Sequence, residues 1–173
     1  MALMHVVIDG YNFLHASAQS DHDWMHLPLE DARAAMLGFL AVRRRPRREK
    51  ITVVFDGSGR VQGGLRADNL HGIEVVFSEP GVTADEVICS MIAAAPNPRA
   101  FLVVTADRAI RTAVLMHGAK VIAPLTFLVS SEEHDDERRR RSAKEPPEKF
   151  KGTRRGEVER WKKIFGFDDD TDE

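Results

Sequence analysis

The sequence has a single cysteine, Cys89, among its 173 residues. One thiol excludes an intramolecular disulfide and any zinc site built from several cysteines. Because Cys89 stands in an apolar run, we expect a buried thiol rather than a nucleophile. No run of about 18 apolar residues is present to cross a membrane, and the N-terminus lacks the basic start and apolar stretch of a secretory signal. We therefore expect a cytoplasmic protein with no membrane partner.

The sequence also has little net charge, because 25 Lys and Arg residues stand against 27 Asp and Glu residues. Hydrophobic residues make up 43% and charged residues 30%, which is typical of a soluble globular protein. Charge is unevenly placed: residues 130–163 carry 12 basic and 9 acidic side chains, and residues 164–173 carry five acids and no base. We predict one domain over residues 1–129 and a charged C-terminal extension over residues 130–173, part helical with a frayed acidic end.

Short apolar runs rich in valine and isoleucine recur along the first 129 residues without polar alternation. This is typical of strands buried on both faces of a parallel sheet, here over Leu3–Ile8, Ile51–Phe55, Ile73–Phe77, Phe101–Val104 and Ala119–Ile122. Helical patterns lie between them, at about 28–40, 83–95 and 108–116. The alternation predicts an α/β fold with a central, mainly parallel sheet of about five strands. We expect the glycine-rich link from Phe55 to Ile73 to be a flexible loop.

Acidic residues follow three of the predicted strands. Asp9 comes directly after the first, Asp56 directly after the second and Asp107 just beyond the fourth, while Asp85 opens a helix. Ligands of open α/β sheets bind at the carboxyl ends of the strands. If these strands are neighbours, the acids share one pocket. Alternatively, each Asp is a helix cap or turn residue, and Asp85 is a favourable charge at a helix N-terminus.

Such a pocket would need a cation. Two carboxylates about 5 Å apart repel each other by roughly 3 kcal/mol at an effective dielectric constant near 20. Hard oxygen ligands with spare room favour Mg²⁺ or Mn²⁺. Ions of this kind lower the pKa of a bound water and stabilise both oxygens of an in-line phosphoryl displacement. The pattern therefore suits hydrolysis of a phosphodiester without a protein nucleophile.

The order of the motifs adds a family resemblance. The segments are Val7-Ile8-Asp9-Gly10-Tyr11-Asn12, Val54-Phe55-Asp56-Gly57, Thr83-Ala84-Asp85, Val104-Thr105-Ala106-Asp107-Arg108-Ala109-Ile110 and Gly118-Ala119-Lys120-Val121-Ile122. Over about residues 4 to 129 the chain resembles the YacP-like NYN domains, a branch of the PIN-like nuclease superfamily. The resemblance implies a three-layer α/β/α sandwich with an acidic metal site that cleaves RNA.

The resemblance also implies roles for single residues. Asp9 matches the first acid of the family and Asn12 the asparagine that supports it. Asp56, Asp85 and Asp107 match the three further acids of the family. The resemblance thus implies that all four carboxylates hold the metal. Ala106 departs from the family, in which serine is common before the last Asp, and removes a hydroxyl that could orient the metal or its water.

An RNA nuclease also needs cations around its acids to hold phosphates. We expect this role for Arg60 and Arg66 in the glycine-rich loop, and for Arg108 and Arg111 beside Asp107. Tyr11 is a candidate for stacking on a base. The alternatives are ordinary surface arginines in a solvated loop and a tyrosine that packs beside the site.

Two functions follow. The first is an endoribonuclease that depends on Mg²⁺ or Mn²⁺ and uses a metal-activated water. The second is an RNA- or ribosome-binding module with weak or no catalysis, motivated by Ala106 and by the charged C-terminal segment. A phospho-acceptor receiver fits poorly, because it needs two adjacent acids after its first strand and Asp9 is followed by Gly10.

Overall fold

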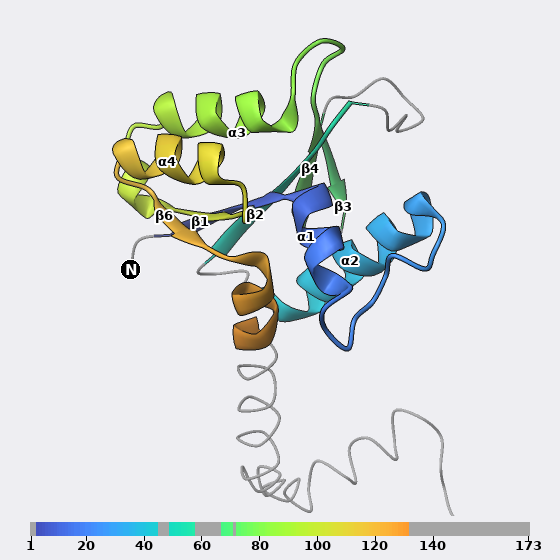
Figure 1. Cartoon of the computed structure of the whole chain (residues 1–173). Coiled ribbons are helices and arrows are strands. Elements are labelled where there is room, and N and C mark those ends of the chain that lie inside the picture. Colours follow the sequence, from blue (N-terminus) through green and yellow to red (C-terminus); the bar gives the residue numbers. More distant parts are fainter. Residues whose placement is uncertain (1–2, 45–48, 58–66, 71, 132–173) are drawn as a thin grey trace, which may run out of the picture. The chain divides into compact units, whose positions relative to one another are not determined.

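The computed structural model covers the whole chain and describes residues 3–44, 49–57, 67–70 and 72–131 (Figure 1). All of these belong to the unit formed by residues 1–134. The predictions for residues 132–173 lie outside the described residues, and the domain boundary after residue 129 stays a prediction. Within the described residues, no helix is long and apolar enough to cross a membrane.

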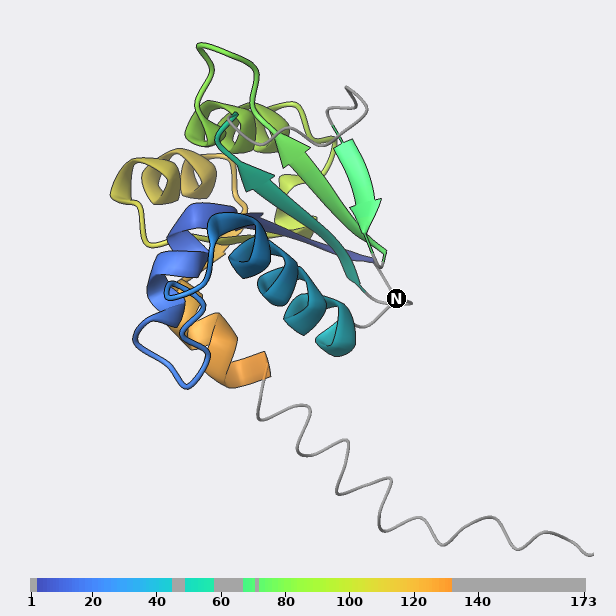
Figure 2. The same ribbon diagram turned by 90° about the vertical axis from the view of Figure 1, so that its right-hand side faces the viewer.

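The core of the fold is a sheet in the order β3-β4-β2-β1-β5-β6. Five strands are parallel, as predicted: β1 (Met4–Asp9), β2 (Glu49–Phe55), β4 (Ile73–Phe77), β5 (Phe101–Val104) and β6 (Lys120–Ile122). Figure 2 shows β2, β4 and the antiparallel edge strand β3 (Ala67–Leu70) side by side. The sheet therefore has one strand more than expected.

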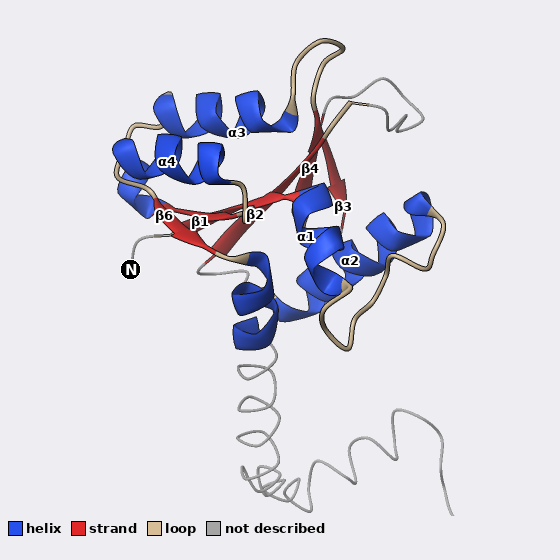
Figure 3. Cartoon of the chain, in the orientation of Figure 1, coloured by secondary structure: helices blue, strands red, loops and turns tan. Residues whose placement is uncertain are grey.

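Helices cover both faces of the sheet, which gives the three-layer sandwich (Figure 3). One face is covered by α1 (Gly10–Ser17), α2 (Leu29–Arg43) and a helical segment at 124–131, and the other by α3 (Ala84–Ala93) and α4 (Arg108–Met116). Gly118 follows the end of α4 with a φ of 86°, a left-handed conformation that favours glycine after a helix.

Side-chain alternation along the strands divides the core between these two faces. Val6 and Ile8 of β1 pack on the α1–α2 side, whereas Val7 packs on the α3–α4 side. In β5, Val103 packs on the α3–α4 side and Val104 on the other. By the same period of two, the side chains of Asp9 and Thr105 emerge on the α3–α4 side.

The structure corrects two expectations from sequence. The link from Phe55 to Ile73 is not all loop, because Ala67–Leu70 pairs with β4 in antiparallel register. The sequence pattern did not indicate α1, which starts directly after β1 with no linker, since Asp9 both ends the strand and caps the helix.

Candidate active site

Asp9 lies at the centre of the carboxyl-terminal edge of the sheet. It ends β1, which is flanked by β2 and β5, so Asp56 and Asp107 follow the two neighbouring strands. After β1 the chain continues into α1 on one face of the sheet, and after β5 it continues into α4 on the other face. In open α/β sheets, ligands bind in the crevice at such a topological switch point. The premise that the acid-bearing strands are neighbours is therefore confirmed.

The Asp9 carboxylate is held by two hydrogen bonds and is only 8% exposed. Its Oδ1 accepts the backbone N–H of Asn12 at 3.3 Å, and its Oδ2 accepts the hydroxyl of Thr105 at 3.2 Å. Burial raises the pKa of Asp9 to about 6, with smaller contributions in the same direction from Asp85 and Asp56. The two hydrogen bonds act in the opposite direction because they favour the ionised form.

Asn12 and Thr105 bridge the switch point between β1 and β5. The Asn12 side-chain oxygen accepts the backbone N–H of Ala106 at 2.8 Å, which ties α1 to the loop after β5. The Thr105 hydroxyl accepts the N–H of Asp107 at 3.1 Å while it donates to Asp9. Thr105 is fully buried, and it was not among the residues predicted for the site. The sequence feature that could have indicated Thr105 is a side-chain hydroxyl two residues before Asp107.

Asp56 and Asp107 each use one carboxylate oxygen to accept backbone N–H groups at the start of a helix. Oδ1 of Asp56 accepts the N–H of Ala84, the first residue of α3, at 2.7 Å. Oδ1 of Asp107 accepts the N–H groups of Ala109 and Ile110 at 2.7 and 3.0 Å and so caps α4. The cap interpretation is therefore correct for Asp107, as it is for Asp9, whereas Asp56 contacts the start of a helix whose N-cap is Thr83.

Asp85 stands in the first turn of α3 and makes no side-chain hydrogen bond within the described residues. Burial raises its pKa, and so do the neighbouring charges of Asp107, Asp56 and Glu86. Its neighbour Glu86 forms a capping box with Thr83 instead, accepting the Thr83 N–H at 2.9 Å. Asp85 is thus within electrostatic range of the acids that follow β2 and β5.

The electrostatic couplings connect all four acids. Asp85 and Asp56 raise the pKa of Asp9, and Asp107 and Asp56 raise that of Asp85. Such repulsion weakens with distance, so each of the four carboxylates has at least one of the others within electrostatic range at this edge of the sheet. A bound cation would reduce this repulsion between the carboxylates.

The donor set fits a hard divalent cation that keeps several of its waters. Within the described part of the chain, no three His, Cys, Asp or Glu side chains form a ready-made ligand group. Mg²⁺ needs only one or two carboxylates, because waters and substrate oxygens complete its octahedron. The oxygen donors at this edge meet that requirement, whereas a closed site of several protein ligands is not formed by the described residues.

The structure places some of the predicted substrate residues. Tyr11 is half-buried, packs edge-on against Phe55 with ring centroids 5.3 Å apart and accepts a hydrogen bond from Arg33. Arg108 is exposed in the first turn of α4, and Arg111 further along that helix is half-buried. Arg60 and Arg66 lie outside the described residues.

The thiol of Cys89 is half-buried rather than fully buried as expected. Burial raises its pKa, and so do the charges of Asp85 and Asp107. A raised pKa lowers the thiolate fraction, which agrees with the expectation that Cys89 is not a nucleophile.

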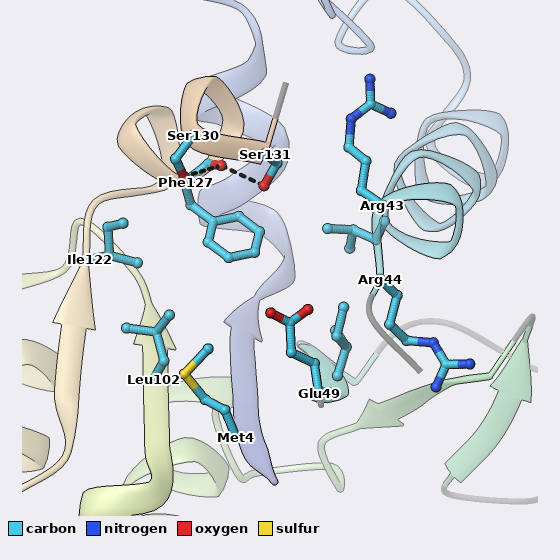
Figure 4. A pocket seen from close by; sticks show the side chains of 11 residues that line it. Met4, Arg43, Arg44, Glu49, Leu102, Ile122, Phe127, Ser130 and Ser131 are labelled. Carbon is cyan, nitrogen blue, oxygen red and sulfur yellow. Dashed lines mark hydrogen bonds between the residues drawn. The ribbon is translucent and has the colours of Figure 1, made fainter. Parts of the chain in front are cut away.

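A cavity of about 210 Å³ lies at the opposite edge of the sheet (Figure 4). Met4 and Glu49, the first residues of β1 and β2, line it together with the end of α2. None of the four acids contributes to this cavity. The acidic edge and the cavity are therefore separate features.

The model of the YacP-like NYN domain family matches residues 6–165. The chain belongs to the YacP-like NYN domain family. Two crystal structures of Rae1 (YacP) from Bacillus subtilis are similar to it. One has a TM-score of 0.59 and 22% identity and covers 96% of this chain and 89% of its own. The other, of a single-residue mutant, has a TM-score of 0.58 and 21% identity and covers 84% and 87%. No curated protein matches the chain.

Membership of the YacP-like NYN family gives the acidic edge its context. The family belongs to the PIN-like nucleases, which act on RNA and generally use divalent metals. The resemblance drawn from the motifs around Asp9, Asp56, Asp85 and Asp107 is confirmed at the level of family and fold. The roles of these four residues stay predictions.

Proposed function

We propose that this YacP-like NYN protein is a divalent-metal-dependent endoribonuclease that hydrolyses RNA phosphodiester bonds in the cytoplasm. The observation that carries the proposal is the electrostatic coupling of four carboxylates at the switch point, with the pKa of Asp9 raised to about 6. Structural carboxylates are normally placed where their ionised form is stabilised. Mutual repulsion of this kind is typical of a site that works with a cation.

In this proposal, Asp9, Asp56, Asp85 and Asp107 hold Mg²⁺ or Mn²⁺. Bound there, such an ion supplies an acidified water and neutralises charge that develops on the phosphate oxygens. The protein positions the acids: Thr105 and the Asn12 N–H fix the two oxygens of Asp9, and N–H groups at the starts of α3 and α4 fix one oxygen each of Asp56 and Asp107. Fixed carboxylates require little reorganisation when the reaction occurs.

The substrate chain would lie along the same edge. Arg108 follows Asp107 directly and Arg111 lies one turn further along α4, where both could neutralise phosphates next to the acids. We extend this role to Arg60 and Arg66, and we keep Tyr11 as a residue that borders the substrate. The substrate in this proposal is RNA, and the ribosome is the setting that we would examine first.

Cleavage of a labelled RNA with Mg²⁺ or Mn²⁺, compared between wild type and Asp9→Asn, tests the proposal. We expect a loss on the order of 100-fold or more, since removing even an outer residue of a metal site costs roughly 10- to 100-fold. Asp21→Asn is a matched control, because Asp21 is an exposed acid between α1 and α2. Equal cleavage by wild type and Asp9→Asn would refute the proposal.

The second candidate is an RNA- or ribosome-binding module with weak or no catalysis. Two observations favour it: Ala106 stands where the family often has serine, and the described acids do not form a closed ligand group. RNA binding that persists in EDTA, with no product after long incubation with either metal, would select this function over the first.

A further inference from the structure

Arg33, in the second turn of α2, is a half-buried cation surrounded by aromatic rings. Its guanidinium carbon lies 5.4 Å from the ring centroid of Tyr11, 5.3 Å from that of Phe55 and 5.4 Å from that of Phe77. One guanidinium nitrogen also donates a hydrogen bond to the Tyr11 hydroxyl. We call Arg33, Tyr11, Phe55 and Phe77 the arginine nest.

The arginine nest lies at the same edge of the sheet as the acids. Tyr11 follows Asp9 by two residues, and Phe55 ends β2 directly before Asp56. The ring of Phe55 also stacks on that of Phe77, the last residue of β4, at 5.6 Å. All three rings pack on the α1–α2 side, whereas Asp9 emerges on the α3–α4 side. The nest and the acids therefore lie on opposite faces of one edge.

The charge of Arg33 is not neutralised by the described residues. None of their carboxylates forms an ion pair with Arg33, and the buried Nε has no hydrogen-bond partner among them. Arg33 is also not among the causes of the shifted pKa values of Asp9 and Asp85. A half-buried cation with no paired carboxylate among the described residues favours binding of an anion.

The rings limit which anion contact is available. Three rings lie close to the guanidinium, its Nε is buried and one terminal nitrogen donates to Tyr11, while the side chain as a whole is half-buried, so the ligand contact that we infer is made by the terminal N–H groups. These groups form a planar fork that matches two oxygens of a phosphate. The packing also holds the fork rigid, so little side-chain freedom is lost when the ligand binds.

On the basis of the proposed nuclease function, we propose that Arg33 binds a backbone phosphate of the RNA next to the one that is cleaved. The RNA would cross the carboxyl-terminal edge of the sheet, with the reacting phosphate at the acids and its neighbour at the arginine nest. Arg33 is thus a substrate-binding residue, and the rings of Tyr11, Phe55 and Phe77 are positioning residues.

Binding of a fluorescein-labelled single-stranded RNA of about 20 nucleotides, measured by anisotropy in EDTA over a range of salt, tests this role without cleavage. For Arg33→Gln we expect about 10-fold weaker binding, the value of a charge-assisted hydrogen bond. The slope of log K against log salt should flatten by about 0.7, which corresponds to one lost phosphate contact on a single strand. Arg33→Lys should keep the slope and lose part of the affinity, because it keeps the charge without the fork.

Arg43→Gln is the matched control. Arg43 lies at the other end of the same helix, with its guanidinium 3.7 Å from the ring centroid of Phe39, and it lines the cavity at the opposite edge (Figure 4). We expect its affinity and slope to equal those of wild type. An unchanged Arg33→Gln, or an equal loss in Arg43→Gln, would overturn the proposal.

Two further measurements keep the outcome clear. If Arg33→Gln does not fold, Tyr11→Phe replaces it, because it keeps the ring and removes the hydroxyl that holds the guanidinium. A several-fold weaker affinity then supports the proposal, and wild-type affinity overturns it.

Cleavage with Mg²⁺ or Mn²⁺ is assayed in parallel on wild type. Failure of that reaction refutes the nuclease function, whereas the dependence of binding on Arg33 is measured independently.

Discussion

The hydroxyl of Thr105 donates a hydrogen bond to Oδ2 of Asp9 at 3.2 Å, across the boundary between β5 and β1. The same hydroxyl accepts the backbone N–H of Asp107 at 3.1 Å. One buried side chain thereby connects two of the four acids. Its position between them makes its removal informative about both stability and activity.

Thr105→Val should destabilise the fold and impair the site. The change keeps the side-chain shape and leaves a buried carboxylate oxygen and a buried N–H without their partner, at a cost of about 1–3 kcal/mol. The pKa of Asp9 should also rise further, because this hydrogen bond lowers it. Urea unfolding and the pH dependence of cleavage measure the two effects. Thr105→Ser keeps the hydroxyl and should retain most of the stability and most of the cleavage activity. An equal loss of stability and activity in the Ser and Val variants would contradict this account.

Asp9 should make the metal-free protein less stable as pH rises. Its pKa is raised from 3.8 to about 6 by folding, so its contribution is fully present below pH 3.8 and is lost as pH rises through about 6. The shift corresponds to about 3 kcal/mol at neutral pH. In EDTA, Asp9→Asn should lack this decline and unfold at a higher temperature than wild type at neutral pH. A Tm of Asp9→Asn below that of wild type there would count against the raised pKa.

Asp85→Asn should separate activity from stability. Asp85 makes no side-chain hydrogen bond within the described residues, and burial together with repulsion from Asp107 and Asp56 raises its pKa. We expect cleavage to fall while the unfolding midpoint stays equal or increases. Its neighbour provides the opposite case: Glu86→Ala removes the side chain that accepts the Thr83 N–H in the capping box and should cost stability, about 0.5–1 kcal/mol, while cleavage persists. Full cleavage by Asp85→Asn would remove Asp85 from the site.

Gly10→Ala should destabilise the protein although alanine favours helices. A Cβ at Gly10, the first residue of α1, would lie 2.3 Å from the Phe55 ring, which is fully buried. Overpacking of this kind typically costs about 1–3 kcal/mol. Gly38→Ala in α2 is the control, because no atom beyond its chain neighbours and the backbone of its own helix lies within 4 Å of its Cβ position, and it should gain about 0.5–1 kcal/mol. Thermal unfolding compares the two, and a stabilised Gly10→Ala would show that Phe55 moves aside freely.

The parallel strands were predictable because each is a short apolar run bounded by polar residues. The antiparallel strand Ala67–Leu70 was not, since it contains Asp68 and Asn69 and lies in a stretch rich in glycine and polar residues. The helix at Gly10–Ser17 was missed for another reason: β1 runs into it without a break, so the change of period falls within a few residues.

The acids of the candidate site were predictable from their places after strands, whereas their supports were not. The contact of Thr105 with Asp9 joins residues 96 apart in sequence and depends on which strands are neighbours. In the sequence, Arg33 is an ordinary polar residue of an amphipathic helix. Its contacts with Phe55 of β2 and Phe77 of β4 exist only in the folded structure. Such partners are defined by tertiary contacts alone.

Three of the four acids also begin helices or, as with Asp56, bind the first N–H of one. Selection for folding would therefore keep Asp9, Asp56 and Asp107 even in a lineage that had stopped cleaving RNA. Asp85 accepts no such hydrogen bond among the described residues, so we expect it to be the first of the four acids to be replaced in that lineage. Across descendants of this fold, variation at Asp85 should then distinguish surviving enzymes from chains that retain only the scaffold.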